Sequence, residues 1–242
     1  MNVAMLIRDA ATAPDWAGLR ISLAAFGLPS ATVAVGEGTV SITLPGDRFV
    51  EIVYVPAPIP GDEVQGWARR LVFWGGGDGS HASHLIAAAR LPGTPLEQAQ
   101  TLTRVLAAAA DVDSAVFGLY WGAGPSLVQT ETLLETLRDD PNDLPIPAWI
   151  GVVGAPTPDD EPAVLTLGIG AFGAPELLVR LPEGNEEDAT DFALSIAAYV
   201  IRTGAKLRAG ETVGLSDTQR LTLTEVPHPF GDERPVLYIP YP

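Results

Sequence analysis

The glycine run at residues 168–173 is the part of the sequence closest to a known chemical motif. Gly168-Ile169-Gly170-Ala171-Phe172-Gly173 has the glycine spacing of the dinucleotide fingerprint, in which amides at the start of a helix bind a pyrophosphate. Pro175 and Pro182 limit any helix that follows to a turn or two. We therefore predict no cofactor at this run. Instead, Gly168 and Gly170 are expected to bare one face of a strand to a helix or an aromatic ring.

A second glycine-rich run, Gly75-Gly76-Gly77-Asp78-Gly79-Ser80, lies before a predicted strand at 84–91. A phosphate-binding loop needs a Lys after its last glycine and a helix whose first amides meet the anion. Here the Lys is missing and a strand comes next. The run is typical of a helix end followed by a flexible loop.

His81 and His84 are three residues apart, a spacing that brings two imidazoles together as metal ligands on a helix. We expect these residues at a junction between loop and strand, where that geometry is not assured. No third ligand lies nearby in the sequence. The sequence therefore predicts no metal site.

His228 is the third histidine, and it stands between Pro227 and Pro229, close to Asp232. A histidine held rigidly beside an acid has the properties of a general base. The alternative is a turn histidine whose ring is bonded by the backbone. We take His228 as a candidate ligand-binding residue.

Few residues of this chain could act as a catalytic nucleophile. Cysteine is absent, so thiol catalysis and thiolate metal ligands are excluded. Ser126 and Ser195 would each have to meet a distant histidine, and neither lies in a nucleophile elbow. We predict no catalytic residues, and the sequence favours a protein that is not an enzyme.

Tyr120 and Trp121 are the other candidate ligand-binding residues. They end a predicted strand just before Gly122-Ala123-Gly124, and ligands bind at such strand ends in open α/β sheets. Packing in the core is the alternative explanation for two adjacent aromatic residues.

The net charge restricts the partners of the protein. The 242 residues include 14 Lys and Arg against 30 Asp and Glu, a formal charge of −16. Such a field repels nucleic acids and anionic membranes, so neither is an expected partner. It attracts basic proteins and cations, although it also serves solubility.

The elements that must position these residues are arranged around a central strand at 114–122. Its apolar and aromatic residues are typical of a strand covered on both faces. The expected helices span 12–26, 62–74, 95–110, 126–137 and 185–203. The other expected strands are 1–9, 39–44, 49–55, 84–91, 148–154, 164–171, 218–226 and 236–241.

This element order predicts an α+β fold of the α/β sandwich type. Each half follows the βαββαβ order of ferredoxin-like units, in a mixed, largely antiparallel sheet with helices. We expect the halves, about 1–92 and 111–242, to be joined by a helix at 95–110. No Gly/Ser linker separates them, so a single compact domain over 1–242 is predicted.

The expected location is the cytoplasm. The first residues, 1–9, have no basic leader before their apolar part, and they are too short to span a bilayer. The longest helix-like apolar stretch, 192–201, is also too short. No segment is predicted to be transmembrane.

Several runs of residues resemble an uncharacterised, mostly bacterial family, domain of unknown function 4261. They are Pro56-Ala57-Pro58-Ile59-Pro60, Gly118-Leu119-Tyr120-Trp121-Gly122, Leu144-Pro145-Ile146-Pro147-Ala148-Trp149, Phe172-Gly173-Ala174-Pro175-Glu176-Leu177 and Gly210-Glu211-Thr212-Val213-Gly214-Leu215-Ser216. The resemblance implies a cytosolic α/β domain. It implies no activity and no catalytic residues.

Two hypotheses of function follow. The first is a non-enzymatic protein-binding module with a basic protein as its partner, of which an antitoxin or immunity protein is one form. The second is a small-molecule sensor or hydrolytic enzyme with a pocket near Tyr120, Trp121 and His228. The sequence leaves the oligomeric state open.

Overall fold

The computed structural model describes residues 2–181, 185–214, 216 and 218–241. Helices and largely antiparallel sheets occur together, so the predicted α+β class is confirmed. The chain divides into two compact units. The first holds the residues up to Arg69 with Trp74–Trp149, and the second holds Arg70–Phe73 with the residues from Ile150 onward. The ferredoxin-like halves and their union in one domain stay predictions.

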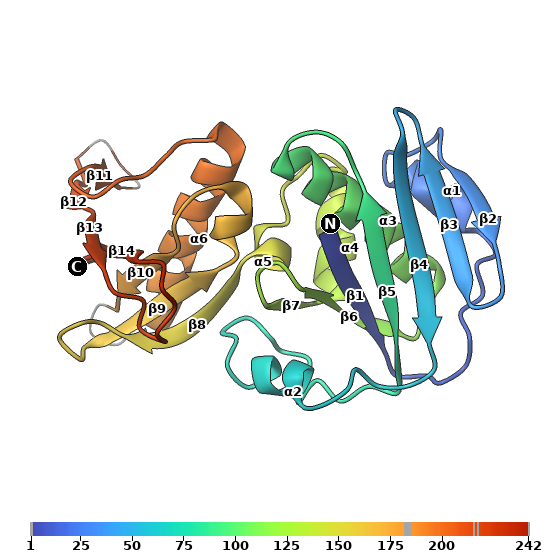
Figure 1. The fold of residues 1–242 in the computed structure, drawn as a ribbon, viewed down its shortest axis with the longest axis horizontal. Coiled ribbons are helices and arrows are strands. Elements are labelled where there is room, and N and C mark those ends of the chain that lie inside the picture. Colours follow the sequence, from blue (N-terminus) through green and yellow to red (C-terminus); the bar gives the residue numbers. More distant parts are fainter. Residues whose placement is uncertain (1, 182–184, 215, 217, 242) are drawn as a thin grey trace. The chain divides into compact units, whose positions relative to one another are not determined.

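The first unit is built on a seven-stranded sheet in which all neighbours run antiparallel (Figure 1). In spatial order its strands are β2 (Thr32–Val35), β3 (Thr39–Leu44), β4 (Arg48–Val55), β5 (Ser83–Arg90), β1 (Asn2–Arg8), β6 (Val116–Trp121) and β7 (Ser126–Gln129). The strand predicted around 114–122 is β6, which pairs with β1 on one side and with β7 on the other. Its interior position is confirmed.

Close packing explains the glycine in the middle of β6. A Cβ on Gly118 would lie 2.8 Å from the side chain of Ile7 on β1 and 3.1 Å from the ring of Trp74. Any larger residue would push one of these two side chains away. Leu119, the next residue, points to the other face of the sheet and is fully buried.

Helices α1 (Leu19–Ala25), α3 (Pro95–Val112) and α4 (Thr130–Asp139) lie together on one side of this sheet (Figure 1). The predicted start of α3 is confirmed, because Thr94 and Glu97 form a capping box ahead of it. Its Leu102, Val105 and Leu106 are fully buried. Two short helices, α2 (Glu63–Ala68) and α5 (Ile146–Trp149), complete the helices described in this unit.

A buried arginine fixes the end of β1 to the end of α3. Arg8 is 1% exposed, and its Nε donates to Oδ2 of Asp113 at 2.7 Å. Its Nη1 donates to the hydroxyl of Ser83 at 2.8 Å and to the carbonyl of Ala10 at 3.2 Å. The ring of Tyr54 lies 5.2 Å from the guanidinium carbon. The charge is thus paired and hydrogen-bonded, as burial requires.

The second unit contains a five-stranded sheet and one long helix. The strand order is β13 (Thr224–Val226), β14 (Val236–Ile239), β10 (Leu177–Arg180), β9 (Pro162–Leu167) and β8 (Gly151–Pro156). The pair of β10 and β14 is parallel and the other neighbours are antiparallel. Helix α6 (Glu186–Thr203) packs on β9 and β10, and β11 (Thr212–Val213) pairs with β12 (Leu221–Thr222).

The segment Arg70–Phe73 belongs to the second unit although it comes from the first third of the chain. Leu71 forms a β-bridge with Val153, and the amide of Val72 donates to the carbonyl of Val152 at 3.0 Å. It therefore extends the sheet beyond β8. This corrects the helix expected over 62–74, because α2 ends at Ala68.

Several expected element bounds are corrected by the structure. The first helix begins at Leu19, after Gly18 in a left-handed conformation, and not at residue 12. Residues 126–129 form strand β7, which pairs with β6, and the helix expected from residue 126 begins at Thr130. The Ser126 hydroxyl donates to the carbonyl of Ala148. The strand expected at 148–154 begins at Gly151. The strand expected at 218–226 divides into β12 and β13.

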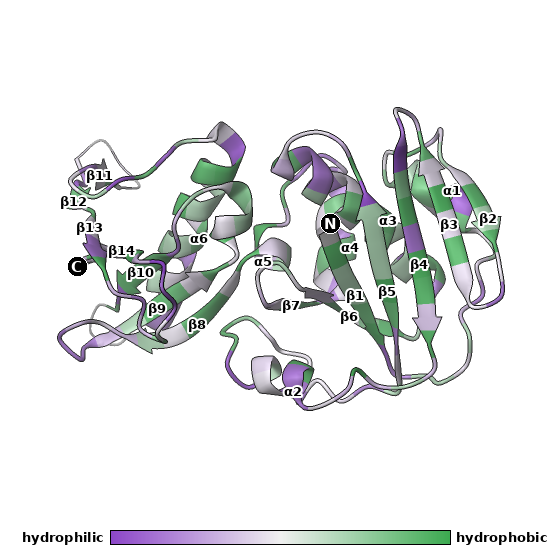
Figure 2. Ribbon diagram, viewed as in Figure 1, coloured by the Kyte–Doolittle hydropathy of each residue, from purple (hydrophilic) through white to green (hydrophobic). Residues whose placement is uncertain are grey.

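In the first unit, hydrophobic residues are concentrated in the strands of the sheet. Figure 2 shows hydrophobic residues along β1, β5 and β6, and hydrophilic residues at the turn between β3 and β4 and at the start of α3. Within the described part of the chain, no helix is both long enough and apolar enough to span a bilayer.

Candidate functional site

The glycine run 168–173 surrounds the carboxylate of Glu176. A short 3-10 helix, η1 (Ile169–Phe172), follows β9 at once. Oε1 of Glu176 accepts hydrogen bonds from the amides of Gly168 at 2.9 Å and Gly170 at 3.0 Å. Oε2 accepts from the amide of Ile169 at 3.2 Å. Three successive amides of the chain thus point at one carboxylate of the same chain.

A fourth donor completes this arrangement, which we name the Glu176 turn. The hydroxyl of Thr166 donates to Oε2 of Glu176 at 2.9 Å and accepts from the amide of Leu177 at 2.8 Å. Carboxylates bonded by several amides are strongly held. In a dinucleotide site these amides would meet a pyrophosphate, and here a side chain of the protein occupies that position.

The Glu176 turn corrects the role expected for the glycines. Gly168 lies after the end of β9 with φ of 119°, where glycine is favoured, so it does not lie on a strand face. A Cβ on Gly170 would lie 3.4 Å from Oε1 of Glu176 and 3.5 Å from Nη1 of Arg234. The close neighbours are therefore a carboxylate and a guanidinium, and not a helix or an aromatic ring.

Arg234 and Asp232 form an ion pair beside the Glu176 turn. Nη2 of Arg234 lies 3.0 Å from Oδ2 of Asp232, and the amide of Arg234 donates to Oδ1 at 2.9 Å. Hydrogen bonds from Arg234 hold the pKa of Asp232 down to about 2. The carboxylate is consequently ionised and engaged at neutral pH, which makes it a poor proton acceptor for catalysis.

The structure places His228 in a turn whose backbone bonds its ring. The amide of Phe230 donates to Nδ1 of His228 at 3.1 Å, so Nε2 carries the proton in the neutral ring. The Phe230 ring lies 5.1 Å from the guanidinium carbon of Arg70. His228 therefore matches the alternative stated above, a turn histidine whose ring is bonded by the backbone.

The Glu176 turn and the turn at His228 fall in one continuous segment. Residues 165–240 match the family model described as Domain of unknown function (DUF4261). The predicted resemblance is confirmed for that segment. No curated protein and no solved structure matches the chain. The DUF4261 segment thus includes η1, Glu176 and Arg234, but the family supplies no activity for them.

His81 and His84 both form hydrogen bonds with the Pro-rich segment 56–60 of the first unit. Nε2 of His81 accepts from the amide of Ile59 at 2.8 Å, and its Nδ1 lies 2.9 Å from the carbonyl of Gly79. Nδ1 of His84 lies 2.8 Å from the carbonyl of Ala57. Burial lowers the pKa of His84. Among the described residues, no group of three His, Asp or Glu side chains is placed to hold a metal ion.

Tyr120 and Trp121 point to opposite faces of β6. The hydroxyl of Tyr120 donates to Oε1 of Glu63 on α2 at 2.7 Å, and burial with this carboxylate raises the Tyr120 pKa. The Trp121 ring centre lies 6.5 Å from that of Trp149 in the core. Both residues belong to the first unit and His228 belongs to the second, so a pocket shared by the three stays a prediction.

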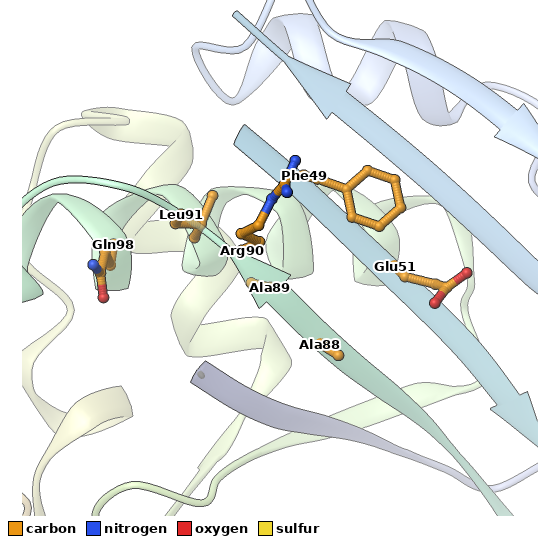
Figure 3. Close-up of a pocket in the computed structure, with 7 residues that line it drawn as sticks. All are labelled: Phe49, Glu51, Ala88, Ala89, Arg90, Leu91 and Gln98. Atoms are coloured by element: carbon orange, nitrogen blue, oxygen red, sulfur yellow. The ribbon is translucent and has the colours of Figure 1, made fainter. Parts of the chain in front are cut away.

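The first unit also has a pocket that sequence reasoning missed. It has a volume of about 500 Å³ and lies where β4 begins and β5 ends, near the start of α3 (Figure 3). Its lining residues are Phe49, Glu51, Ala88, Ala89, Arg90, Leu91 and Gln98. A smaller pocket shares Arg90 and Leu91 with it, and a third pocket, which Arg48 and Arg104 line, shares Pro92 with that smaller one.

Cross-strand register explains how the pocket is built. Phe49 pairs with Arg90 and Glu51 pairs with Ala88, so these four side chains share one face of the sheet. Residues pointing the other way, such as Val50 and Ile52, are fully buried. The sequence signal for this site was an arginine ending an alanine-rich strand, which becomes meaningful only once β4 is known to be its neighbour.

Proposed function

We propose that this protein is a non-enzymatic binding protein whose partner is a basic protein. The observation that carries the proposal is the charge of −16, from 30 acidic against 14 basic residues. Complementary charge accelerates and selects the association of two proteins. A toxin neutralised by this acidic protein is one partner of that chemistry.

The arrangement of the polar side chains supports this proposal. The ring nitrogens of His81 accept from or face backbone groups, the Ser126 hydroxyl donates to a carbonyl, and Asp232 is paired with Arg234. Each of these groups takes part in holding the fold. General base or nucleophilic work would require releasing such a contact first.

The second unit carries two groups of exposed carboxylates. Asp159, Asp160 and Glu161 form the turn between β8 and β9, and Glu186 and Glu187 begin α6. The amide of Leu181 donates to the carbonyl of Pro162 at 2.9 Å, so Leu181 lies beside the start of β9. We name these five carboxylates the acidic end, and we propose it as the surface that meets the partner.

The test compares two variants with equal charge change. The first is Asp159→Asn, Asp160→Asn and Glu187→Gln at the acidic end, where Asn suits the φ of 64° at Asp160. The matched control is Glu131→Gln, Glu135→Gln and Asp139→Asn on α4, all exposed. Proteins captured by the wild type at low salt are identified, purified and measured for affinity with each variant.

The proposal predicts a basic partner whose affinity falls as salt rises. It also predicts that the acidic-end variant weakens binding by roughly tenfold, while the α4 variant has little effect. Equal weakening by both variants would mean that the net charge determines the affinity and that the acidic end is not the binding surface. A partner without excess positive charge, or binding insensitive to salt, contradicts the proposal itself.

A small-molecule sensor is the second candidate function. The pocket of about 500 Å³ beside Phe49 and Arg90 favours it, because this volume lies in the range of roughly 300–1,000 Å³ typical of ligand sites. Thermal-shift screening with metabolites tests this role, since a ligand that binds the folded state raises the melting temperature. No stabilisation by any compound counts against it.

We further propose the cytoplasm as the place of action. The chain has no cysteine, so its fold depends on no disulfide and needs no oxidising compartment. Cell fractionation that recovers the protein outside the cytoplasm would contradict this location.

A further inference from the structure

We infer that the pocket beside Phe49 and Arg90 binds a small amphipathic carboxylate, a molecule with one anionic group and an apolar body. This inference rests on the small-molecule role proposed above. It names the ligand class and the side chains that recognise it.

Arg90 supplies the positive charge for the anionic group. It is exposed at the end of β5 and lines both the main pocket and one adjoining pocket. Its side chain forms no ion pair and no hydrogen bond with any described residue. A guanidinium offers a planar pair of donors that matches a carboxylate, so Arg90 is available for a bidentate contact.

The floor of the pocket suits an apolar body. Ala88 leaves space on the face of the sheet that carries Arg90, and Phe49 and Leu91 border that space on either side of Arg90 (Figure 3). Phe49 is half-buried and directly opposite Arg90 in the β4–β5 register. An alkyl or aryl group lying on Ala88 would be removed from water against the Phe49 ring.

Glu51 limits the ligand to a single negative charge. It lies on the same face as Arg90, two residues beyond Phe49 along β4, which is about 7 Å along the strand. An anionic group bound at Arg90 is repelled by this carboxylate, and the repulsion grows with the charge of the group. A carboxylate therefore fits the pocket better than a phosphate monoester, which carries close to two negative charges at neutral pH.

The test is a titration of the full-length protein with hexanoate, followed by the backbone amide signals in NMR. Hexan-1-ol has the same apolar body without the charge, and hexyl phosphate carries the second charge. We expect hexanoate to shift the amides of Phe49 and Ala88–Leu91 and to bind more tightly than either of the other two compounds.

Two substitutions have opposite expected effects, which separates recognition from a loss of folding. Arg90→Gln should weaken hexanoate binding by roughly tenfold or more, because a charged hydrogen-bonded contact is lost. Glu51→Gln should tighten it severalfold, because a repelling charge is removed. Arg20→Gln, at another exposed arginine of the same unit, is the matched control and should leave the affinity unchanged.

Three results would overturn the inference. They are equal binding of hexanoate and hexan-1-ol, wild-type affinity in Arg90→Gln, and weaker binding in Glu51→Gln. If uncharged or cationic compounds shift the same amides while hexanoate does not, the carboxylate assignment is wrong but the small-molecule role stands. If no compound shifts them, both are wrong.

Discussion

The two ends of the ladder between β1 and β5 carry one arginine each, in opposite surroundings. Arg8 pairs with Ser83 at one end, and Arg90 follows the last paired residues of β5 at the other. Arg8 is buried against Asp113, and its donors meet oxygen atoms of the protein. Arg90 is exposed and, in the described part of the chain, has no such partner. We call the Arg8 end closed, because its charge is paired within the protein, and the Arg90 end open, because its guanidinium is exposed.

This difference distinguishes charged side chains that stabilise the fold from charged side chains that are available to bind a ligand. A buried guanidinium is tolerated only where the fold replaces its hydration, so its neighbours are fixed by stability. An exposed guanidinium keeps its water and can exchange it for a ligand. By this criterion the Glu176 turn resembles the Arg8 end, because the donors around that carboxylate also belong to the chain.

Asp113→Ala should give the largest effect and is the strongest test of the comparison. The substitution leaves the buried charge of Arg8 without its partner, which costs about 3–5 kcal/mol of unfolding free energy. Arg90→Gln at the open end should change stability by less than about 0.5 kcal/mol. Urea denaturation of both variants measures the two values. Similar losses at the two ends would remove the distinction between them.

Glu176→Ala should have the next largest effect and tests whether the Glu176 turn belongs with the closed end. It removes the acceptor of three amides and one hydroxyl, at a cost of about 1–3 kcal/mol. Hydrogen exchange at the amides of Gly168 and Gly170 should become faster. Glu225→Ala, at an exposed residue of the same unit, is the matched control. Unchanged exchange in Glu176→Ala would mean that the carboxylate does not hold the turn.

The pH dependence of stability should show the smallest effect, from His84 beside Ser83 at the closed end. Burial lowers the His84 pKa in the folded protein, so below about pH 6.5 the unfolded chain binds the proton more readily. Stability is therefore full above that pH and falls as the pH decreases, by at most about 1.4 kcal/mol per pH unit. Urea denaturation between pH 5 and pH 8, a range of about 3 units around the ordinary histidine pKa, measures the slope. It should be shallower in His84→Gln, and an identical slope would show that the ring does not titrate as proposed.

Local sequence patterns predicted the elements whose signals lie within a few residues. The capping box of Thr94 and Glu97 with Pro95 gave the start of α3, and the apolar run around Leu119 gave β6. Where a local signal was ambiguous, the prediction was wrong. The helix expected from residue 126 begins at Thr130, and the Ser126 hydroxyl instead donates to the carbonyl of Ala148, a residue that no nearby pattern indicates.

The candidate sites were less predictable, because their members come from separate elements. The glycine spacing at 168–173 is that of an anion-binding turn, but the anion that it meets is the carboxylate of Glu176, which the spacing alone does not indicate. The pocket beside Arg90 depends on the pairing of β4 with β5. That register brings Phe49 and Glu51 to Arg90 across roughly forty residues of sequence, and a one-residue shift would turn both away.

By itself, the sequence determined the α+β class, the charge of −16, the buried strand β6 and the segment that matches DUF4261. These properties follow from composition and from patterns a few residues long. Only the tertiary structure decided that Arg8 meets Asp113 and that Arg90 remains open, although both are arginines at strand ends. The reason is physical: burial and pairing depend on which distant residues reach a side chain, and a local pattern does not specify them.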